Sequence, residues 1–385
     1  MLVDKVQNKL EHWKNKALTR TRLTIQKTEG NQVVVNSLSC INFCNNDYLA
    51  LAKHPKIMEA YLNGIQQYGL GSGASSVVSG YYSAQHELET RFAEWLGVES
   101  AILFSSGYLA NLGVIGALAD RSSTVFSDKL SHASILDGIQ LSRAKHYRYR
   151  HGCVTDLARL AKLKRPDYII SESVFSMEGT IAPVNEIITT ANQYQASTII
   201  DDAHGIGVLG EQGGGICEYA KLDSRQLACL ITPLGKAFNA MGAIVAGRSE
   251  IIEAILQFAR SYRYSTALPP AICVALLTTL DVVRASRWRR EKLAEIIQFF
   301  TENALARGFK LSSTETTPIK SIIIGDSLKV LELQQDLLSK GFLISCIRPP
   351  TVAHNTARVR ICLNCDHTQD QIRTLLDHMS NSLLR

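Results

Sequence analysis

The chain has 385 residues, of which 46% are hydrophobic and 20% are charged, and its formal net charge is +6. This composition is typical of a soluble globular protein, and no uninterrupted apolar run approaches the roughly 20 residues that span a bilayer. The length exceeds the usual size of a single core, which predicts one large domain with one or two smaller ones.

The first twenty residues, "MLVDKVQNKLEHWKNKALTR", are charged and helix-like, without the apolar centre of a signal peptide. The nine cysteines are an odd number scattered among strong secondary-structure patterns, which favours reduced thiols. We therefore expect a cytoplasmic protein. Cys362 and Cys365 have the spacing of half a zinc site, but no second pair accompanies them, so we predict no metal site.

Three regions follow one another along the chain. Residues 1–45 read as an N-terminal arm, an amphipathic helix followed by a short strand. Residues 46–280 alternate helices with short apolar strands, which predicts an α/β domain with a mostly parallel sheet covered on both faces. Residues 281–385 contain a long helix, several strands and a final helix, typical of a smaller α+β domain.

The densest basic stretch, "RAKHYRYRH", runs from Arg143 to His151. Tyrosines interleaved with basic residues occur in some nucleic-acid-binding proteins. A strand with one exposed basic face explains the same pattern, so we predict no nucleic-acid partner.

Several predicted strands end in polar residues, among them Glu172 and Asp201, and ligands bind at the carboxyl ends of strands in open α/β sheets. The run "GIGVLG" after Asp201 has the GxGxxG spacing, but the glycine-rich "EQGGGICEY" that follows cannot form the first turn of a dinucleotide-binding helix. "LGKA" is no phosphate loop either, because Ala237 follows Lys236 where a serine or threonine is needed.

Lys236 lies in the apolar run "ITPLGKAFNAMGAIVAG", and Asp201 lies one strand–helix–strand excursion earlier. A lysine shielded from water loses its proton more easily and can form a Schiff base with an aldehyde. Pyridoxal phosphate needs such a lysine, an acid for its ring nitrogen, a flat group over its ring and donors for its phosphate. Asp201, His132 and the turn "SSGYLAN" are of the right types. Read singly, each residue is also compatible with a purely structural role.

The motifs resemble, in order and spacing, those of the α-oxoamine synthases, pyridoxal-phosphate enzymes of the aspartate-aminotransferase fold. The resemblance rests on "NFCNNDYLAL", "GSGASSVVSGY", "LFSSGYLAN", "DKLSHASILDG", "ESVFSMEGTIAPV", "IIDDAHGIGVLGEQG", "LGKAF", "YRYSTALPP", "IRPPTV" and "TARVRICL". It covers nearly the whole chain, which makes it far more specific than any single motif.

The resemblance implies a role for each matching residue. Lys236 would carry the cofactor's aldehyde, Asp201 would pair with the ring nitrogen, and His132 would stack on the ring. The other implied cofactor contacts are His204, Ser176, Gly107, Tyr108 and Thr232, with Ser265 and Thr266 reaching the phosphate of the partner subunit in a homodimer. The implied substrate contacts are Arg20, Asn46, Thr351 and Arg360, and Glu172 lies in a matching motif nearby.

The resemblance also implies an activity, the decarboxylative condensation of an amino acid with an acyl thioester. "IRPPTV" resembles the members that join L-alanine to a pimeloyl group on coenzyme A or acyl carrier protein in biotin biosynthesis. The alternatives are a relative using glycine with acetyl-CoA, a relative using serine with a long-chain acyl-CoA, and a non-catalytic partner subunit.

Two positions near Lys236 depart from the family's pattern. Pro233 stands where the family commonly has a threonine that binds the phosphate, which leaves Thr232 as the nearest hydroxyl. Asn239 stands where the family has glycine, and asparagine tolerates a left-handed backbone better than most residues.

Overall fold

The computed structural model describes residues 2–383 and divides into two compact units. The central unit comprises Leu49–Ser176 and Ile181–Glu291, and the terminal unit comprises Met1–Tyr48, Met177–Thr180 and Lys292–Arg385. The N-terminal arm predicted from the sequence is thus grouped with the C-terminal part of the chain.

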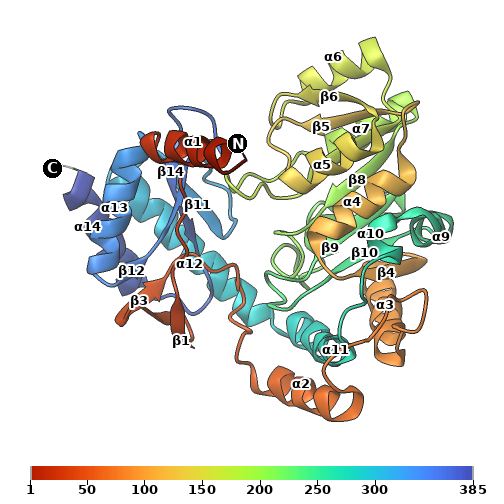
Figure 1. Cartoon of the computed structure of the whole chain (residues 1–385), viewed down its shortest axis with the longest axis horizontal. Coiled ribbons are helices and arrows are strands. Elements are labelled where there is room, and N and C mark those ends of the chain that lie inside the picture. The colour runs from red at the N-terminus through yellow and green to blue at the C-terminus, as the bar shows by residue number, and fades with distance from the viewer. Residues whose placement is uncertain (1, 384–385) are drawn as a thin grey trace. The chain divides into compact units, whose positions relative to one another are not determined.

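The central unit alternates helices and strands (Figure 1). Its elements are α2 (Pro55–Tyr68), α3 (Ser83–Leu96), β4 (Ser100–Phe104), α4 (Gly107–Leu118), β5 (Thr124–Asp128), α5 (Ala133–Ser142), β6 (Lys145–Tyr149), α6 (Val154–Lys164), β7 (Tyr168–Glu172), α7 (Val184–Tyr194), β8 (Ser197–Asp201), α8 (Gly215–Tyr219), the 3-10 turn η1 (Ser224–Gln226), β9 (Cys229–Pro233), β10 (Ala243–Gly247), α9 (Ser249–Phe258), α10 (Arg260–Arg263) and α11 (Pro270–Ala285).

Within residues 49–291 the strands form one seven-stranded sheet in the order β4-β10-β9-β8-β7-β5-β6. The strands from β9 to β6 are parallel to one another, and β10 is antiparallel to both of its neighbours. The predicted mostly parallel sheet is confirmed. The basic stretch beginning at Arg143 contains the edge strand β6, as the strand interpretation predicted.

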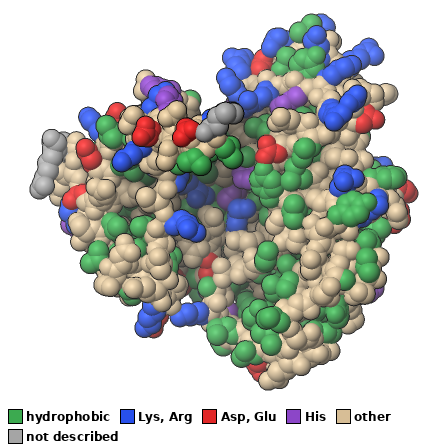
Figure 2. Space-filling model, in the orientation of Figure 1, with side chains coloured by type: hydrophobic (Ala, Val, Ile, Leu, Met, Phe, Trp, Pro, Cys, Tyr) green, Lys and Arg blue, Asp and Glu red, His purple; other side chains and the backbone are tan. Residues whose placement is uncertain are grey.

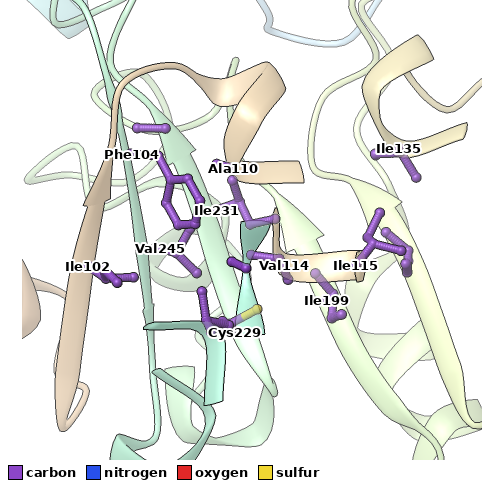
Figure 3. Packing of buried hydrophobic residues seen from close by; sticks show 14 of the residues in the cluster. Ile102, Phe104, Ala110, Val114, Ile115, Ile135, Ile199, Cys229, Ile231 and Val245 are labelled. Carbon is purple, nitrogen blue, oxygen red and sulfur yellow. The ribbon is translucent and has the colours of Figure 1, made fainter. Parts of the chain in front are cut away.

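Helix α4 supplies the apolar face that packs on this sheet (Figure 3). Ala110 and Val114 lie four residues apart, one turn along the helix, and both are fully buried. They meet alternate residues of the strands, which point to one face of the sheet. Burial stabilises the fold by roughly 0.8 kcal/mol for the methyl group of Ala110 and by roughly 1.5–3 kcal/mol for the side chain of Val114, which holds the N-terminal half of α4 against the strands.

The terminal unit contains two small sheets, one with strand order β1-β2-β3-β12 and the other β11-β14-β13. Its elements are α1 (Leu2–Asn15), β1 (Ile25–Glu29), β2 (Gln32–Val35), β3 (Leu38–Asn42), most of α12 (Arg287–Ala306), β11 (Ile319–Gly325), α13 (Ser327–Ser339), β12 (Phe342–Leu343), β13 (Ser345–Ile347), β14 (Ala357–Cys362) and α14 (Gln369–Leu383). Strand β12 pairs in parallel with β3, which explains why the arm belongs to this unit.

A short internal segment, Met177–Thr180, also belongs to the terminal unit. Three of its carbonyl groups accept hydrogen bonds from the side chains of Ser321, Ser312 and Thr317, at 2.7, 2.7 and 2.6 Å. Gly179 has φ +74° and a Cβ there would lie 2.1 Å from the Ile319 carbonyl oxygen, so only glycine is accommodated.

Among residues 2–383, no helix has the combination of length and apolar composition that crossing a membrane requires.

Candidate active site

The carboxyl ends of the parallel strands bring several predicted residues together in the central unit. Asp201 ends β8 and Glu172 ends β7, and the two are in register on neighbouring strands. Asp201 is also in register with Ile231 of β9, five residues before Lys236. His132 lies just before α5, in the connection that follows β5. This edge of the sheet is the candidate active site.

Asp201 is a buried carboxylate, only 4% exposed, held by neutral donors. Its Oδ2 accepts a hydrogen bond from the side-chain amide of Asn111 at 2.6 Å, and its Oδ1 accepts one from the backbone N–H of Ala203 at 3.0 Å. Because these donors carry no formal charge, they fix the carboxylate in place without neutralising it.

A chain of hydrogen bonds connects Asp201 to His132. Besides binding Asp201, the Asn111 amide donates to the Ser134 hydroxyl at 3.0 Å, and that hydroxyl lies 2.7 Å from Nδ1 of His132. The Ser134 backbone N–H also donates to Nδ1, at 3.3 Å. Nδ1 therefore acts as an acceptor, which places the proton of the neutral imidazole on Nε2.

His132 is held through its backbone as well as its ring. Its N–H donates to Oε1 of Glu172 at 2.7 Å, which gives this buried acid a positioning role. Withdrawal of the ring from water lowers the pKa of His132; Asp201 opposes that shift, and Lys236 adds to it. The electrostatic interaction with both groups places the three predicted catalytic residues in one site.

Lys236 lies in the loop between β9 and β10. The loop is closed by hydrogen bonds from Leu234 N–H to the Gly242 carbonyl at 2.9 Å and from Asn239 N–H to the Lys236 carbonyl at 2.8 Å. Asn239 has φ +44°, the left-handed backbone that the sequence suggested for this position. The loop thus presents a half-buried Lys236 from a fixed backbone.

The N-terminus of α4 packs directly against β9. Ser106 caps the helix by accepting from Leu109 N–H at 3.3 Å, and the helix begins at Gly107. A Cβ on Gly107 would lie 2.6 Å from Cγ of Pro233, so the proline ring occupies the space that any larger residue would need. The first-turn N–H groups, including that of Tyr108, have no partner within the helix and suit an anion.

Thr232 does not support the phosphate role predicted for it. Its side chain is fully buried, and its hydroxyl donates to the Ile244 carbonyl at 3.1 Å. Side chains alternate along a strand, so Thr232 points to the face opposite Pro233 and away from Gly107. The sheet geometry, which the sequence alone did not reveal, commits this hydroxyl to β10.

The remaining predicted cofactor residues lie in the same unit. His204 is 4% exposed in the turn after β8, and Ser176 is half-buried after β7. Thr266 is exposed, and the neighbouring Ala267 accepts a hydrogen bond from Ser72 at 2.8 Å. This bond brings the motifs "GSGASSVVSGY" and "YRYSTALPP" together.

The predicted substrate residues lie in the terminal unit. Arg360 on β14 is 7% exposed, and its Nη2 donates to Oδ1 of Asn46 at 3.2 Å. The same oxygen accepts from the Tyr48 hydroxyl at 3.2 Å and from the Cys362 thiol at 3.4 Å. Asn46 therefore fixes Arg360 without supplying a negative charge.

Arg20 and Thr351 both bind the backbone of the segment that begins at Arg348 in this unit. Arg20 donates to the carbonyls of Arg348 and Pro349, both at 3.2 Å, and Arg348 donates in turn to the Thr19 carbonyl at 3.0 Å. Thr351 N–H donates to the Arg348 carbonyl at 3.1 Å. The arm and the segment "IRPPTV" are thus joined.

Comparison with known proteins identifies the family of this chain. The model of the class I and II aminotransferases matches residues 39–379. The chain belongs to the class I and II aminotransferase family. It is 43% identical over 366 residues to an 8-amino-7-oxononanoate synthase of Hahella chejuensis, covering 94% of this chain and 92% of that protein. With the synthase of Thioalkalivibrio sulfidiphilus it shares 42% identity over 381 residues, or 98% and 97% of the two chains.

Solved structures of related enzymes have the same fold as this chain. A serine palmitoyltransferase from S. paucimobilis matches with a TM-score of 0.92 at 26% identity, covering 98% of this chain and 96% of that one. An 8-amino-7-oxononanoate synthase from Francisella tularensis matches with a TM-score of 0.81 at 33% identity, covering 90% and 98%. The predicted fold and the resemblance to the α-oxoamine synthases are confirmed.

Sequence reasoning did not assign roles to Asn111 and Ser134. Both lie inside motifs that carry the family resemblance, but their function depends on the approach of α4 and α5 to the end of β8. A polar residue inside the otherwise apolar helix "GYLANLGVIGAL" was the available signal for Asn111.

Proposed function

We propose that this chain condenses L-alanine with a pimeloyl thioester, using pyridoxal phosphate, to give 8-amino-7-oxononanoate, carbon dioxide and the free thiol in biotin biosynthesis. The observation that carries the proposal is the hydrogen-bonded site of Asp201, Asn111, Ser134 and His132 beside Lys236. The relatives at 42–43% identity over nearly the full chain support the same function.

The residues present fit this cofactor. The carboxylate of Asp201 is buried among neutral donors, which suits a protonated ring nitrogen. The first turn of α4, with Gly107 and Tyr108, offers backbone N–H groups to the phosphate, and Ser176 and His204 would add hydrogen bonds. When bound, pyridoxal phosphate supplies an aldehyde for the amino group and an electron sink for the carbon next to it.

Each catalytic side chain then has one task. The Lys236 amine takes the proton from Cα of alanine and later returns one to the product. Asp201 would keep a proton on the ring nitrogen of the bound cofactor, because its negative charge favours the protonated form. His132, neutral with its proton on Nε2, would lie over the ring of the bound cofactor and would keep water from the reacting carbon.

Binding and orientation of the substrates fall to the terminal unit. The Arg360 guanidinium, oriented by Asn46, would bind the alanine carboxylate in a fork geometry. Arg20 and Thr351 would contact the acyl donor. The carbanion at alanine Cα attacks the thioester carbonyl, the thiol leaves, and the resulting β-keto acid loses carbon dioxide.

A homodimer is part of the proposal. The loop after α2 exposes large apolar side chains, including Leu70 at 88% and Val78 at 78%, on a surface that a second copy would cover. Ser265 and Thr266 lie beside this loop, where they would reach the phosphate bound by the partner.

Mass spectrometry of the product from purified protein, L-alanine and pimeloyl-CoA tests the reaction. We expect 8-amino-7-oxononanoate from the wild type and none from Lys236→Ala, which should also lose the visible absorption of bound cofactor. Product from glycine with acetyl-CoA, or from serine with a long-chain acyl-CoA, in place of alanine would instead assign the activity of a relative. A protein that stays colourless after addition of pyridoxal phosphate would exclude the proposal.

A further inference from the structure

Basic residues are concentrated in one part of the chain. Residues 121–165 contain ten Lys and Arg and three Asp, a net charge of +7, whereas the whole chain carries +6. All ten basic residues are exposed. We call the exposed Lys and Arg side chains of residues 121–165 the basic face; the chain outside this segment has a net charge of −1.

The three acids of this segment do not neutralise the basic face. Asp128 is 1% exposed and accepts from the backbone N–H groups of Leu130 and Gly152 at 2.8 and 2.9 Å. Asp137 accepts from the Tyr108 hydroxyl. Only Asp156 pairs with members of the face, Arg150 and Arg159. Lys145 and Lys162 form no ion pair among residues 2–383. Most of this positive charge is therefore available to a partner.

The basic face extends from the candidate active site along the edge of the sheet. Lys129 directly follows β5, its N–H donates to the Tyr149 carbonyl at 2.9 Å, and it precedes His132 by three residues. From there the face follows β6 and α6, where Nζ of Lys164 lies 5.6 Å from the centre of the Tyr147 ring. Figure 2 shows blue side chains gathered over α6 and β6, which lie together in Figure 1.

The dimensions of this surface favour a macromolecule over a small anion. Strand β6 spans about 13 Å and α6 about 16 Å, so the charges at their far ends cannot all contact one nucleotide. An extended basic surface beside an active site attracts an extended acidic partner and raises its rate of encounter.

We propose that the basic face docks an acidic acyl carrier protein that delivers the pimeloyl thioester to the site. This inference rests on the proposed function, in which the donor is either coenzyme A or a carrier protein. A carrier protein lying along β6 and α6 would place its phosphopantetheine arm at the strand ends near Lys129. Lysines on an edge strand also discourage pairing with other strands. If that were their only role, reversing their charge would not change kcat/KM with either acyl donor.

The double variant Lys145→Glu/Lys162→Glu tests the docking. We measure kcat/KM with pimeloyl-acyl carrier protein and with pimeloyl-CoA, and the affinity for holo-acyl carrier protein in the absence of turnover. We expect kcat/KM for the carrier-protein donor and the affinity to fall by about tenfold or more, and kcat/KM for pimeloyl-CoA to change less than about twofold. The wild-type carrier-protein reaction should weaken steeply as salt increases.

The control is Lys310→Glu/Lys329→Glu, which makes the same change in charge at exposed positions of the terminal unit. It should leave kcat/KM with each donor, and the affinity for holo-acyl carrier protein, within about twofold of the wild-type values. An equal loss with both donors, or no loss of carrier-protein affinity in the Lys145/Lys162 variant, would overturn the docking proposal. If the wild type binds holo-acyl carrier protein through this face but makes no product with either donor, docking stands and the proposed function fails.

Discussion

Asp201 in the central unit and Arg360 in the terminal unit are held in the same way. Each is a buried charge, 4% and 7% exposed, and each is bound by the side-chain amide of an asparagine. Asn111 donates to Asp201 at 2.6 Å, and Asn46 accepts from Arg360 at 3.2 Å. The amide uses its donor in one case and its acceptor in the other.

A third charge shows what this arrangement avoids. Arg358 lies two residues before Arg360 on β14, yet it forms an ion pair with Glu178 at 2.9 Å. Glu178 neutralises the Arg358 charge, which serves the structure, whereas the Asn46 side chain that binds Arg360 is an uncharged amide. An amide fixes the direction of a buried charge without neutralising it, which is what a preorganised binding site requires.

Removing the charge of Asp201 is the strongest test of this comparison. Asp201→Asn keeps the size of the side chain but no longer favours a protonated ring nitrogen, and we expect kcat to fall by about 10²–10³-fold. Steady-state kinetics with L-alanine measure this. The matched control is Asp202→Asn at the next position, which should lower kcat only a few-fold; equal losses in both variants would remove the distinction between the two acids.

Replacing the amide that binds Arg360 by a carboxylate is the corresponding test in the terminal unit. Asn46→Asp places a carboxylate beside the guanidinium, where it competes with the substrate carboxylate. We expect the KM for L-alanine to rise by about 10–100-fold with a smaller change in kcat. Asn46→Ala removes the amide without adding a charge and should raise the KM for L-alanine less. A larger rise in KM for the Asn46→Ala variant than for the Asn46→Asp variant would contradict the role of the amide.

The start of α4 depends on close packing between Gly107 and Pro233 and not on an amide. Gly107→Ala would place a Cβ 2.6 Å from the Pro233 ring, which cannot turn aside. We expect a loss of about 1–3 kcal/mol in the free energy of unfolding, with weaker cofactor binding. Urea unfolding and titration with pyridoxal phosphate measure both. Adding Pro233→Ala should restore most of the loss, and additive losses would show that the two residues do not interact.

The smallest effect concerns Asp202, next to Asp201. It accepts from Ile216 N–H at 3.0 Å, and burial with the nearby charge of Asp201 raises the pKa of Asp202 from 3.8 to about 7. The native state then holds this proton more tightly than the unfolded state, so stability falls as pH rises from about 4 to about 7. Asp202→Asn should make that fall shallower. Glu89, whose pKa burial also raises to about 7, should leave a residual slope. Urea unfolding at pH 5 and pH 8 decides this, and an unchanged slope would count against the assignment.

The alternation of helices and strands, the mostly parallel sheet and the polar strand ends could be read from the sequence, because apolar runs, turn residues and the position of Asp201 are local features. The partners that hold the charges could not. Asn111 and Asp201 are 90 residues apart, and Asn46 and Arg360 are 314 apart, so only the folded chain brings them together. Thr232 shows the converse case. Its position near Lys236 in the sequence suggested a contact with the phosphate, but in the sheet its hydroxyl donates to the Ile244 carbonyl.

The pairing of β12 with β3 has a consequence for how the protein is made. Phe342 pairs with Ile41, so the arm synthesised first waits for a strand synthesised about 300 residues later. The central unit ends at Glu291 and is complete on the ribosome before that strand emerges. Domains fold largely as units during synthesis, so the Asp201 site assembles first and the Arg360 site is completed last.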